Sequence, residues 1–450
     1  MKHAILFLII CLSAFPLLEA QEAVDTASVL SSQPWTLAQC IAYAKKNNIQ
    51  VRTQQVTKAI SDVDLVAAKA QQTPTLSFRS SFNLAVQNAT TYNEFMEKAE
   101  AVSYNDSYGL SAGWTLYNGG RIQNNIRQQQ VQNTAYQYDV DQTKFDLEIS
   151  VTQAYLQLLY ANEALKTARL TADLSQAQVD RGQQMRDAGS ISKGDLAQLQ
   201  SQAAGDKYNV TTAVNTLANA RLQLKQLLEL GLDDPFDVYF PTLDNHVVLS
   251  PIPPLSTVYE NALQDLPQMK SSALGMEAAE LAVEVAKASK RPTLSLSAGI
   301  NTGTSTGNEN GYFQQLGTKL NENVGLSLSV PIFNNRQART NISKAQLQVQ
   351  TAQLQDLNIK KQLLSTLESL HNDAVSAQSQ YTAANEQLDA AAISFEIVTE
   401  QFHAGLKNTI ELITEENNYS NALISQLQAK FKAVLALKLL QIYQNQSIEL

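Results

Sequence analysis

The sequence predicts a mixed chain of four β-strands and very long coiled-coil helices, arranged as an internal two-fold repeat. Three observations predict this fold. Residues 75–234 and 332–450 contain no proline, and a proline-rich stretch at 233–254 lies between these blocks. Short motifs recur at a spacing of about 216 residues. Each copy also contains segments in which apolar and polar residues alternate, followed by a much longer segment with helical periodicity.

The first 20 residues have the features of a secretory signal peptide. A basic start is followed by an apolar run from Ala4 to Ala14, and the small residue Ala20 precedes the expected cleavage site. Cys11 lies inside the apolar run, so we predict no lipid attachment. Cys40 is then the single cysteine of the mature chain, which excludes an internal disulfide, and we expect it in the core.

The duplication sets the expected domain organisation. Residues 73–77 (TPTLS) match residues 291–295 (RPTLS). An eight-position run of Leu, Val, Ala and Tyr at alternating spacings of four and three also recurs in the second half, in phase. We therefore expect a signal peptide at 1–20, a first repeat at 21–232, a Pro-rich linker at 233–254 and a second repeat at 255–450.

Each repeat is expected to run through the same elements: a helical segment, two strands, and two long helices that meet at a short turn containing glycine. In the second repeat, Pro267 divides the first helical segment. The expected helices are 36–72, 120–186, 193–230, 255–266, 268–290, 336–403 and 408–443, and the expected strands are 74–87, 103–117, 292–303 and 321–333.

The four strands alternate cleanly between an apolar and a polar face. In the last strand, for example, Val324, Leu326 and Leu328 oppose Ser327 and Ser329. A half-buried sheet in a soluble protein is one interpretation. Three features favour a membrane strand instead: lengths of about ten residues, aromatic residues near strand ends, and a polar face of Ser, Thr, Gly and Asn that suits a wetted lumen.

Four such strands cannot close a barrel by themselves. An open edge in hydrocarbon leaves backbone groups unpaired at a cost of several kcal/mol each. Two chains would supply eight strands around an interior filled by side chains, whereas three would supply twelve strands around an open lumen. We therefore expect a homotrimer in which four strands per chain form a twelve-stranded transmembrane β-barrel in contact with lipid.

The two longest helices are predicted to cross a large distance. Residues 121–185 and 337–403 contain no proline, and at ~1.5 Å per residue each would extend on the order of 100 Å. Their four-three spacing predicts coiled-coil packing. A soluble, spectrin-like coiled coil is the alternative, but it does not explain why strands interrupt both copies at the same place.

The strand-to-helix junctions, taken with the repeat spacing, resemble those of the TolC-like outer membrane efflux protein family, and the resemblance covers essentially all of the mature chain. It implies a homotrimer in the cell outer membrane, with a coiled-coil helical tunnel across the periplasm and the 233–254 linker in its equatorial region. It also implies partners: a periplasmic membrane-fusion adaptor and an inner-membrane pump of the RND or ABC type. The junction residues are Asn118, Gly119, Gly120 and Arg121 in the first copy and Asn334, Asn335 and Arg336 in the second.

The resemblance also places the turns at Gly189 and Gly405 at the periplasmic end of the tunnel, where the bore narrows to a gate. Asp195 and Glu411 follow these turns at equivalent positions. Our hypothesis is that Asp195 pairs with Lys407 to hold neighbouring coils closed. Glu411 from three chains would then form an acidic ring that favours cations. The alternative is that these charges only stabilise helix N-termini.

Several other classes of function are disfavoured by the sequence. The net charge of −9 disfavours nucleic acid as a partner. We expect no catalytic, metal or cofactor site, because the few histidines lack ligand spacing and neither a phosphate-binding loop nor a nucleophile elbow is present. Glu415 and Glu416 are adjacent on a helix, point to different sides, and are expected on a solvated face.

The predicted function is therefore that of a passive exit duct for small molecules in a tripartite efflux or export system. The outlet of a type I protein-secretion system is an alternative with the same architecture. A non-conducting surface adhesin or scaffold is an alternative of another class, in which the aromatic-rich loops at 88–102 and 304–320 would bind a partner.

Overall fold

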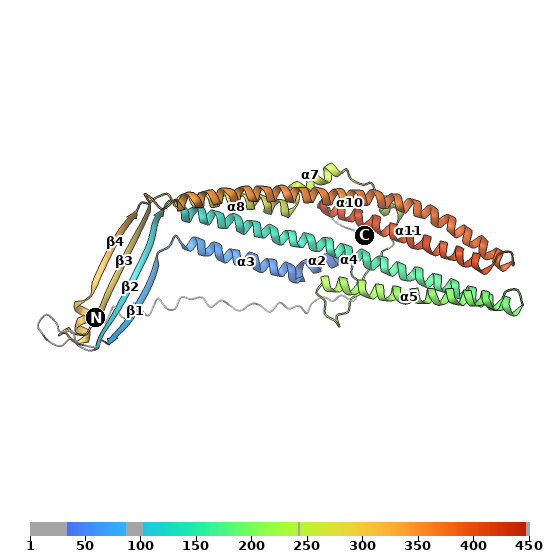
Figure 1. The fold of residues 1–450 in the computed structure, drawn as a ribbon, viewed down its shortest axis with the longest axis horizontal. Coiled ribbons are helices and arrows are strands. Elements are labelled where there is room, and N and C mark those ends of the chain that lie inside the picture. Colours follow the sequence, from blue (N-terminus) through green and yellow to red (C-terminus); the bar gives the residue numbers. More distant parts are fainter. Residues whose placement is uncertain (1–33, 87–101, 242–243, 447–450) are drawn as a thin grey trace.

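The protein is an elongated molecule with a sheet at one end and helices along the rest of its length (Figure 1). This computed structural model describes residues 34–86, 102–241 and 244–446. The predicted signal peptide at 1–20 and most of the predicted loop at 88–102 lie outside the described residues. Within the described part, no helix combines the length and the apolar character needed to cross a membrane.

The two halves of the chain pass through a closely similar order of elements. The strands are β1 (Thr75–Val86), β2 (Val102–Asn118), β3 (Thr293–Ser305) and β4 (Asn321–Ser329). The helices are α2 (Leu37–Asn47), α3 (Ile49–Ala70), α4 (Arg121–Asp187), α5 (Lys193–Leu227), α6 (Asn245–Val248), α7 (Leu255–Asp265), α8 (Pro267–Ala288), α9 (Tyr312–Thr318), α10 (Gln337–His403) and α11 (Thr409–Tyr443).

The strands form one antiparallel sheet in the order β1-β2-β3-β4. Its register aligns apolar residues across the strands, as where Ala112 pairs with both Leu76 and Ala298. On the opposite face the Ser77 and Ser111 hydroxyls lie 2.8 Å apart. The alternation predicted from the sequence thus produces a sheet with one apolar and one hydroxyl-rich face.

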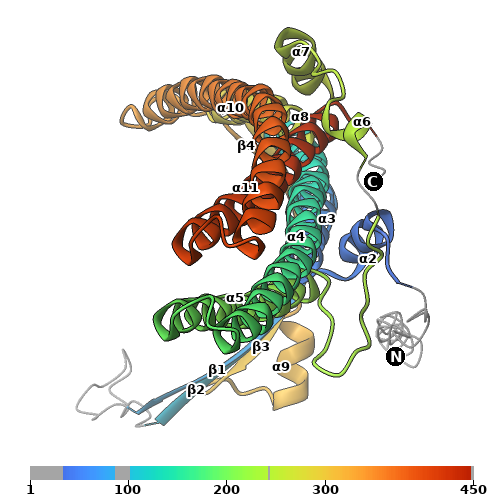
Figure 2. The same cartoon turned by 90° about the vertical axis from the view of Figure 1, so that its right-hand side faces the viewer.

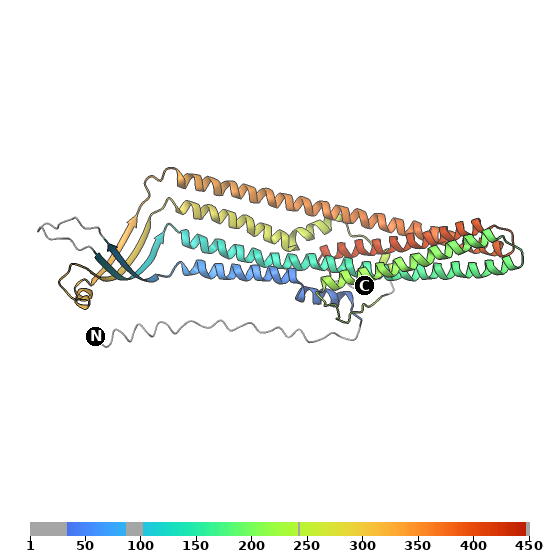
Figure 3. The same ribbon diagram turned by 60° about the horizontal axis from the view of Figure 1, so that its bottom comes forward.

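The helices continue the strands in the same lateral order. Helices α3, α4, α8 and α10 adjoin β1, β2, β3 and β4 and form one layer, while α5 packs on α4 and α11 on α10 towards the far end (Figure 3). Seen along the long axis, these helices make a curved wall with α2 and α7 on its convex side (Figure 2).

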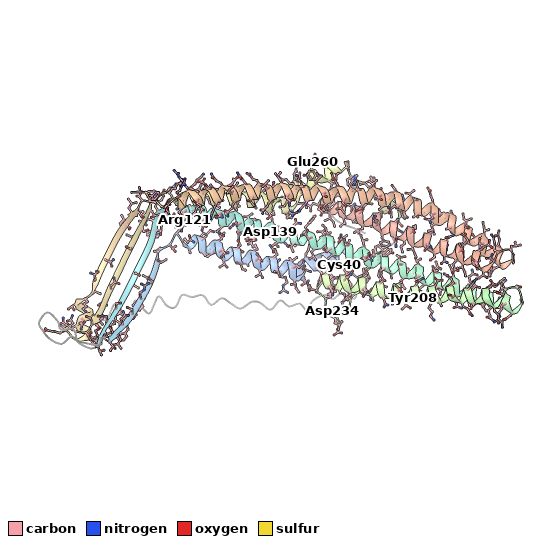
Figure 4. All side chains as sticks on the ribbon, viewed as in Figure 1. Cys40, Arg121, Asp139, Tyr208, Asp234 and Glu260 are labelled. Atoms are coloured by element: carbon pink, nitrogen blue, oxygen red, sulfur yellow. The ribbon has the colours of Figure 1, made fainter. Side chains whose placement is uncertain are left out.

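The largest apolar core lies midway along the helices, where the linker between the two halves passes. Tyr155 of α4 is 1% exposed and its hydroxyl donates to the Tyr239 carbonyl at 2.6 Å. Trp35 pairs with Val238 through a β-bridge. Cys40 is fully buried in the same core, and Figure 4 shows it midway along the molecule.

The structure corrects three expectations. The single helix predicted over 36–72 is broken at Asn48, whose extended backbone (ψ 134°) separates α2 from α3. The strand predicted over 321–333 ends at Ser329, just before Pro331, because proline has no N–H to donate to a ladder. The loop expected at 304–320 contains a short helix, α9.

Candidate gate and assembly surfaces

The first helical turn-back ends α4 and starts α5 at the end of the molecule far from the sheet. Gly189 has φ 78°, and the Ser190 N–H donates to the Met185 carbonyl at 2.8 Å, which closes α4 with a left-handed residue. Ser192 then caps α5: Asp195 N–H donates to the Ser192 hydroxyl at 3.1 Å, and Ser192 N–H donates to the Asp195 carboxylate at 3.0 Å.

The second turn-back has the same construction. Gly405 has φ 74°, and α11 starts with a capping box in which Glu411 N–H donates to Asn408 at 2.9 Å and Asn408 N–H donates to Glu411 at 3.1 Å. Asp195 and Glu411 therefore occupy the same place in their turns. Each carboxylate accepts a hydrogen bond from an N–H group at a helix start and lies at the positive end of the helix dipole. This is the role that the alternative interpretation gave to these charges, namely to stabilise helix N-termini.

The ion pair at this end differs from the predicted one. Lys407 Nζ lies 2.6 Å from Glu411 Oε1, one turn further along, and the ion pairs within the described chain do not join Lys407 to Asp195. A contact between these two residues across neighbouring chains stays a prediction. Lys407 holds the pKa of Glu411 below its usual range, and the Ser192 hydroxyl lowers the pKa of Asp195, so both acids carry charge at neutral pH.

A small apolar cluster joins the two hairpins just behind these turns. Leu199 of α5, Phe402 of α10 and Leu412 of α11 are almost completely buried together. Gly182 of α4 faces this cluster, and a Cβ there would lie 2.5 Å from a methyl of Leu199. The interior glycine of α4 therefore allows close approach of the hairpins rather than a bend.

A buried acid lies at the seam between α5 and α11, and the sequence did not reveal it. Glu416, expected on a solvated face, is 1% exposed, and neither carboxylate oxygen has a hydrogen-bond partner among the described residues. Burial, with a smaller effect of Asp206, raises its pKa to about 7. Nearby, the Gln202 amide bridges Asp206 and Asn417 at 3.2 Å each. Only tertiary packing marks Glu416 as different from its neighbour Glu415.

The strand-to-helix junctions have equivalent backbone conformations in the two copies. Gly119 and Gly120 have φ of 69° and 84°, and Asn335 and Arg336 have φ of 50° and 63°. In the first copy, Asn118 Oδ1 accepts from Ile122 N–H at 3.2 Å, and Arg291 donates to the Gly119 carbonyl at 2.8 Å. Figure 4 places Arg121 at this boundary between sheet and helices. The second copy keeps the left-handed turn without glycine.

The described part of the chain has open lateral edges along the sheet and the helices. β1 and β4 each pair with only one strand of the described sheet, and every residue of β1 is exposed. The edge helices carry exposed apolar stripes on faces that the described residues leave uncovered. These stripes are Ile49, Val56, Ile60, Val63 and Val66 on α3, and Leu347, Leu354 and Leu357 on α10.

Comparisons with known proteins agree with this geometry. The family described as outer membrane efflux protein matches residues 41–229 and 258–442. The outer membrane efflux protein BepC of Brucella suis is 20% identical over 421 residues, which are 89% of this chain and 83% of that protein. The alkaline protease secretion protein AprF of Pseudomonas aeruginosa is 26% identical over 307 residues, 65% of this chain and 60% of that protein.

A solved structure has the same fold. The structure of CusC, described in terms of transmembrane channel formation, has a TM-score of 0.78 and 18% identity, covering 93% of this chain and 96% of that one. Since the two matched family segments make up most of the sequence, the chain belongs to the outer membrane efflux protein family and is an outer-membrane channel with a large periplasmic part, not an enzyme.

Proposed function

We propose that the chain is one protomer of a homotrimeric exit duct in a tripartite efflux system, which conducts small molecules from an inner-membrane pump and a periplasmic adaptor to the outside. The observation that carries this proposal is the pair of open edges. A sheet of four strands with two unpaired edges leaves backbone groups unsatisfied in lipid, and three copies joined β4 to β1 would satisfy them in a twelve-stranded barrel.

The dimensions of the strands and helices support a path across the outer membrane and the periplasm. The 12 residues of β1 extend roughly 40 Å, and a tilt of about 40° leaves a height of roughly 30 Å, close to a bilayer core. The 67 residues of α4 extend on the order of 100 Å away from the sheet. The hydroxyl-rich sheet face would line the lumen with groups that water solvates, and the apolar face would contact lipid.

The assembly is tested by the mass of the purified protein in detergent and by the swelling of liposomes that contain it. Three copies per particle and rapid swelling in sugars small enough to pass are the expected results. A monomer in detergent would end the duct proposal. A trimer that leaves liposomes impermeable would instead favour the adhesin or scaffold alternative.

The tip residues are proposed as the gate. Lys407 lies against Glu411 in the single chain, so Lys407→Ala should expose three acids at the narrow end and strengthen block by divalent cations in single-channel recordings. Glu411→Ala should weaken that block, and Asp195→Ala should change the resting conductance. Glu415→Ala, on the same helix but away from the turn, is the control. If conductance and cation block stay unchanged in all three variants, the gate proposal is wrong.

An outlet for protein secretion is the second candidate, and one observation favours it. AprF, which is similar to 65% of this chain, is named a protein of alkaline protease secretion. The architecture serves both roles, because the inner-membrane partner selects the cargo. Co-purification of the tagged chain with its adaptor and pump separates them: an RND pump supports small-molecule efflux, and an ABC pump supports protein export.

A further inference from the structure

Helix α9 is fixed against the strand that precedes it. The Thr302 hydroxyl donates to the Leu316 carbonyl at 2.6 Å, and Ser305 N–H donates to the Gln315 side chain at 2.9 Å. Lys319 Nζ closes the segment by donating to the Ser305 hydroxyl at 2.7 Å. Helix α9 is therefore held in place at the end of the sheet furthest from the helices (Figure 1).

The register shows which face of the sheet α9 covers. Thr302 is separated from Leu296 and Ile300 by even numbers of residues along β3, so all three side chains lie on the same face. The hydroxyl that holds α9 is therefore on the apolar, lipid-facing side. The Tyr312 hydroxyl lies 3.0 Å from that of Tyr108, which pairs with Thr302 on the same face. Helix α9 thus lies against the outer wall of the barrel, not across its mouth.

The apolar band of this face ends beneath α9. On this face the pair of Asp106 and Thr304 lies two pairs beyond the last apolar pair, Leu110 and Ile300, and Asp106 is 8% exposed. Thr304 N–H donates to its carboxylate at 2.6 Å, the Thr304 hydroxyl also donates to it, and the Tyr108 hydroxyl donates at 3.2 Å. A carboxylate is costly to place in hydrocarbon, so Asp106, together with the exposed Glu322 that pairs with Ile300, sets the boundary of the hydrocarbon at this level.

Helix α9 carries exposed aromatic side chains at the level of this boundary. Phe313 is 86% exposed, and its ring stands edge-on to that of Tyr312, which is 40% exposed. Leu320, just after the helix, is 52% exposed. Aromatic rings are favoured at the headgroup level of bilayers, where short amphipathic segments lie in the plane of the interface.

We propose that α9 is an interfacial lipid anchor: Phe313 inserts at the headgroup–acyl boundary of the outer leaflet, and the polar side of α9 stays bonded to the barrel. Lipid is the partner because the exposed rings lie beside Leu110 and Ile300, the last apolar pair of β2 and β3, at the level where Asp106 and Glu322 end the apolar band of that face. The proposal needs only the outer-membrane location of the sheet and does not depend on which pump the duct serves.

The test uses a fluorescent NBD label on cysteine at position 313 of the full chain in phosphatidylcholine vesicles. The native Cys40 does not interfere, because it is fully buried and its pKa is raised to about 12 by burial. Leu326→Cys on the apolar face and Ser327→Cys on the polar face are matched controls from adjacent positions of β4. The quenchers are iodide in water and phosphatidylcholine with doxyl groups at carbon 5 or carbon 12.

For Phe313→Cys we expect blue-shifted emission, little loss with iodide, and a greater loss of intensity with 5-doxyl than with 12-doxyl lipid. The Leu326 label should be quenched by doxyl lipid and the Ser327 label by iodide, which establishes that the sheet is inserted. With those controls in order, a label at 313 that iodide quenches and doxyl lipid does not would overturn the anchor, and would point to a protein partner or to water. The duct proposal would be unaffected by that result.

Discussion

Glu416 is held where water does not reach, and this gives the packing of the two hairpins a pH dependence. Its pKa is about 7 in the folded chain against 4.5 for a free glutamate. The folded state therefore keeps a proton, between these pH values, that the unfolded state has lost. The stabilising effect of that proton is complete below pH 4.5 and is lost as the pH rises through about 7.

We expect Glu416→Gln to remove this loss, because an amide of similar shape cannot ionise. At pH 8 the variant should be more stable than the parent by up to about 3 kcal/mol, and near pH 4.5 the two should be nearly equal. Guanidinium unfolding followed by helical circular dichroism at the two pH values measures this. Glu415→Gln is the matched control, since the Glu415 carboxylate accepts from the Ser394 hydroxyl at 3.0 Å. Identical pH profiles for parent and Glu416→Gln would refute the assignment.

At the scale of elements, the strand-to-helix junctions test whether backbone conformation or side-chain chemistry matters there. A Cβ at Gly119 would lie 2.8 Å from the Ala288 carbonyl oxygen, and φ is already positive. We expect Gly119→Ala to lower the free energy of unfolding by at least about 1 kcal/mol. Arg336→Gly at a left-handed position of the second junction should raise it by up to about 1 kcal/mol. Thermal unfolding of the detergent-purified protein decides the signs; a loss in both variants would show that the Arg336 side chain makes a contact of its own.

Long elements could be predicted from the sequence because their patterns persist over many residues. The heptad-like spacing placed α4 and α10 to within one or two residues, and alternation placed β1 and β2 similarly. The break at Asn48 was missed because its cause is distant in sequence. The Asn48 side-chain amide donates to the Leu227 carbonyl at 3.0 Å, while its side-chain oxygen accepts from the Gln50 N–H and caps α3.

In the candidate sites too, features set by local sequence could be predicted, and features set by contacts distant in sequence could not. The tips were predictable because glycine and a capping acid are local signals, visible at Gly189 and Gly405. The pairing of Lys407 with Glu411 inside one chain was not predicted, because rotamer and packing choose between two acids; its pairing with Asp195 of a neighbouring chain stays a prediction. The burial of Glu416 and the docking of α9 were also beyond the sequence, since both depend on which surfaces meet after folding.

At the scale of the whole molecule, the proposed trimer brings α3 of one curved wall against α10 of the next. The stripe on α3 lies opposite the face that packs on α4, and Val63 within it is 67% exposed. A carboxylate there would have to be buried against the stripe of the neighbouring chain, at Leu354 or its neighbours, without a partner, at a cost of several kcal/mol.

We therefore expect Val63→Asp to shift the detergent-purified protein from trimer towards monomer, measured by light scattering, while the helical content of each chain is kept. Gln55→Asp is the matched control: it adds the same charge at an exposed position of α3 outside the stripe, and the trimer should survive. Leu354→Asp, on the opposite edge of the chain, should reproduce the Val63 result because the two stripes would meet in the ring. If Val63→Asp left the trimer intact while Leu354→Asp abolished it, α10 would have to contact some other surface of its neighbour, and the proposed closure of the wall would be wrong.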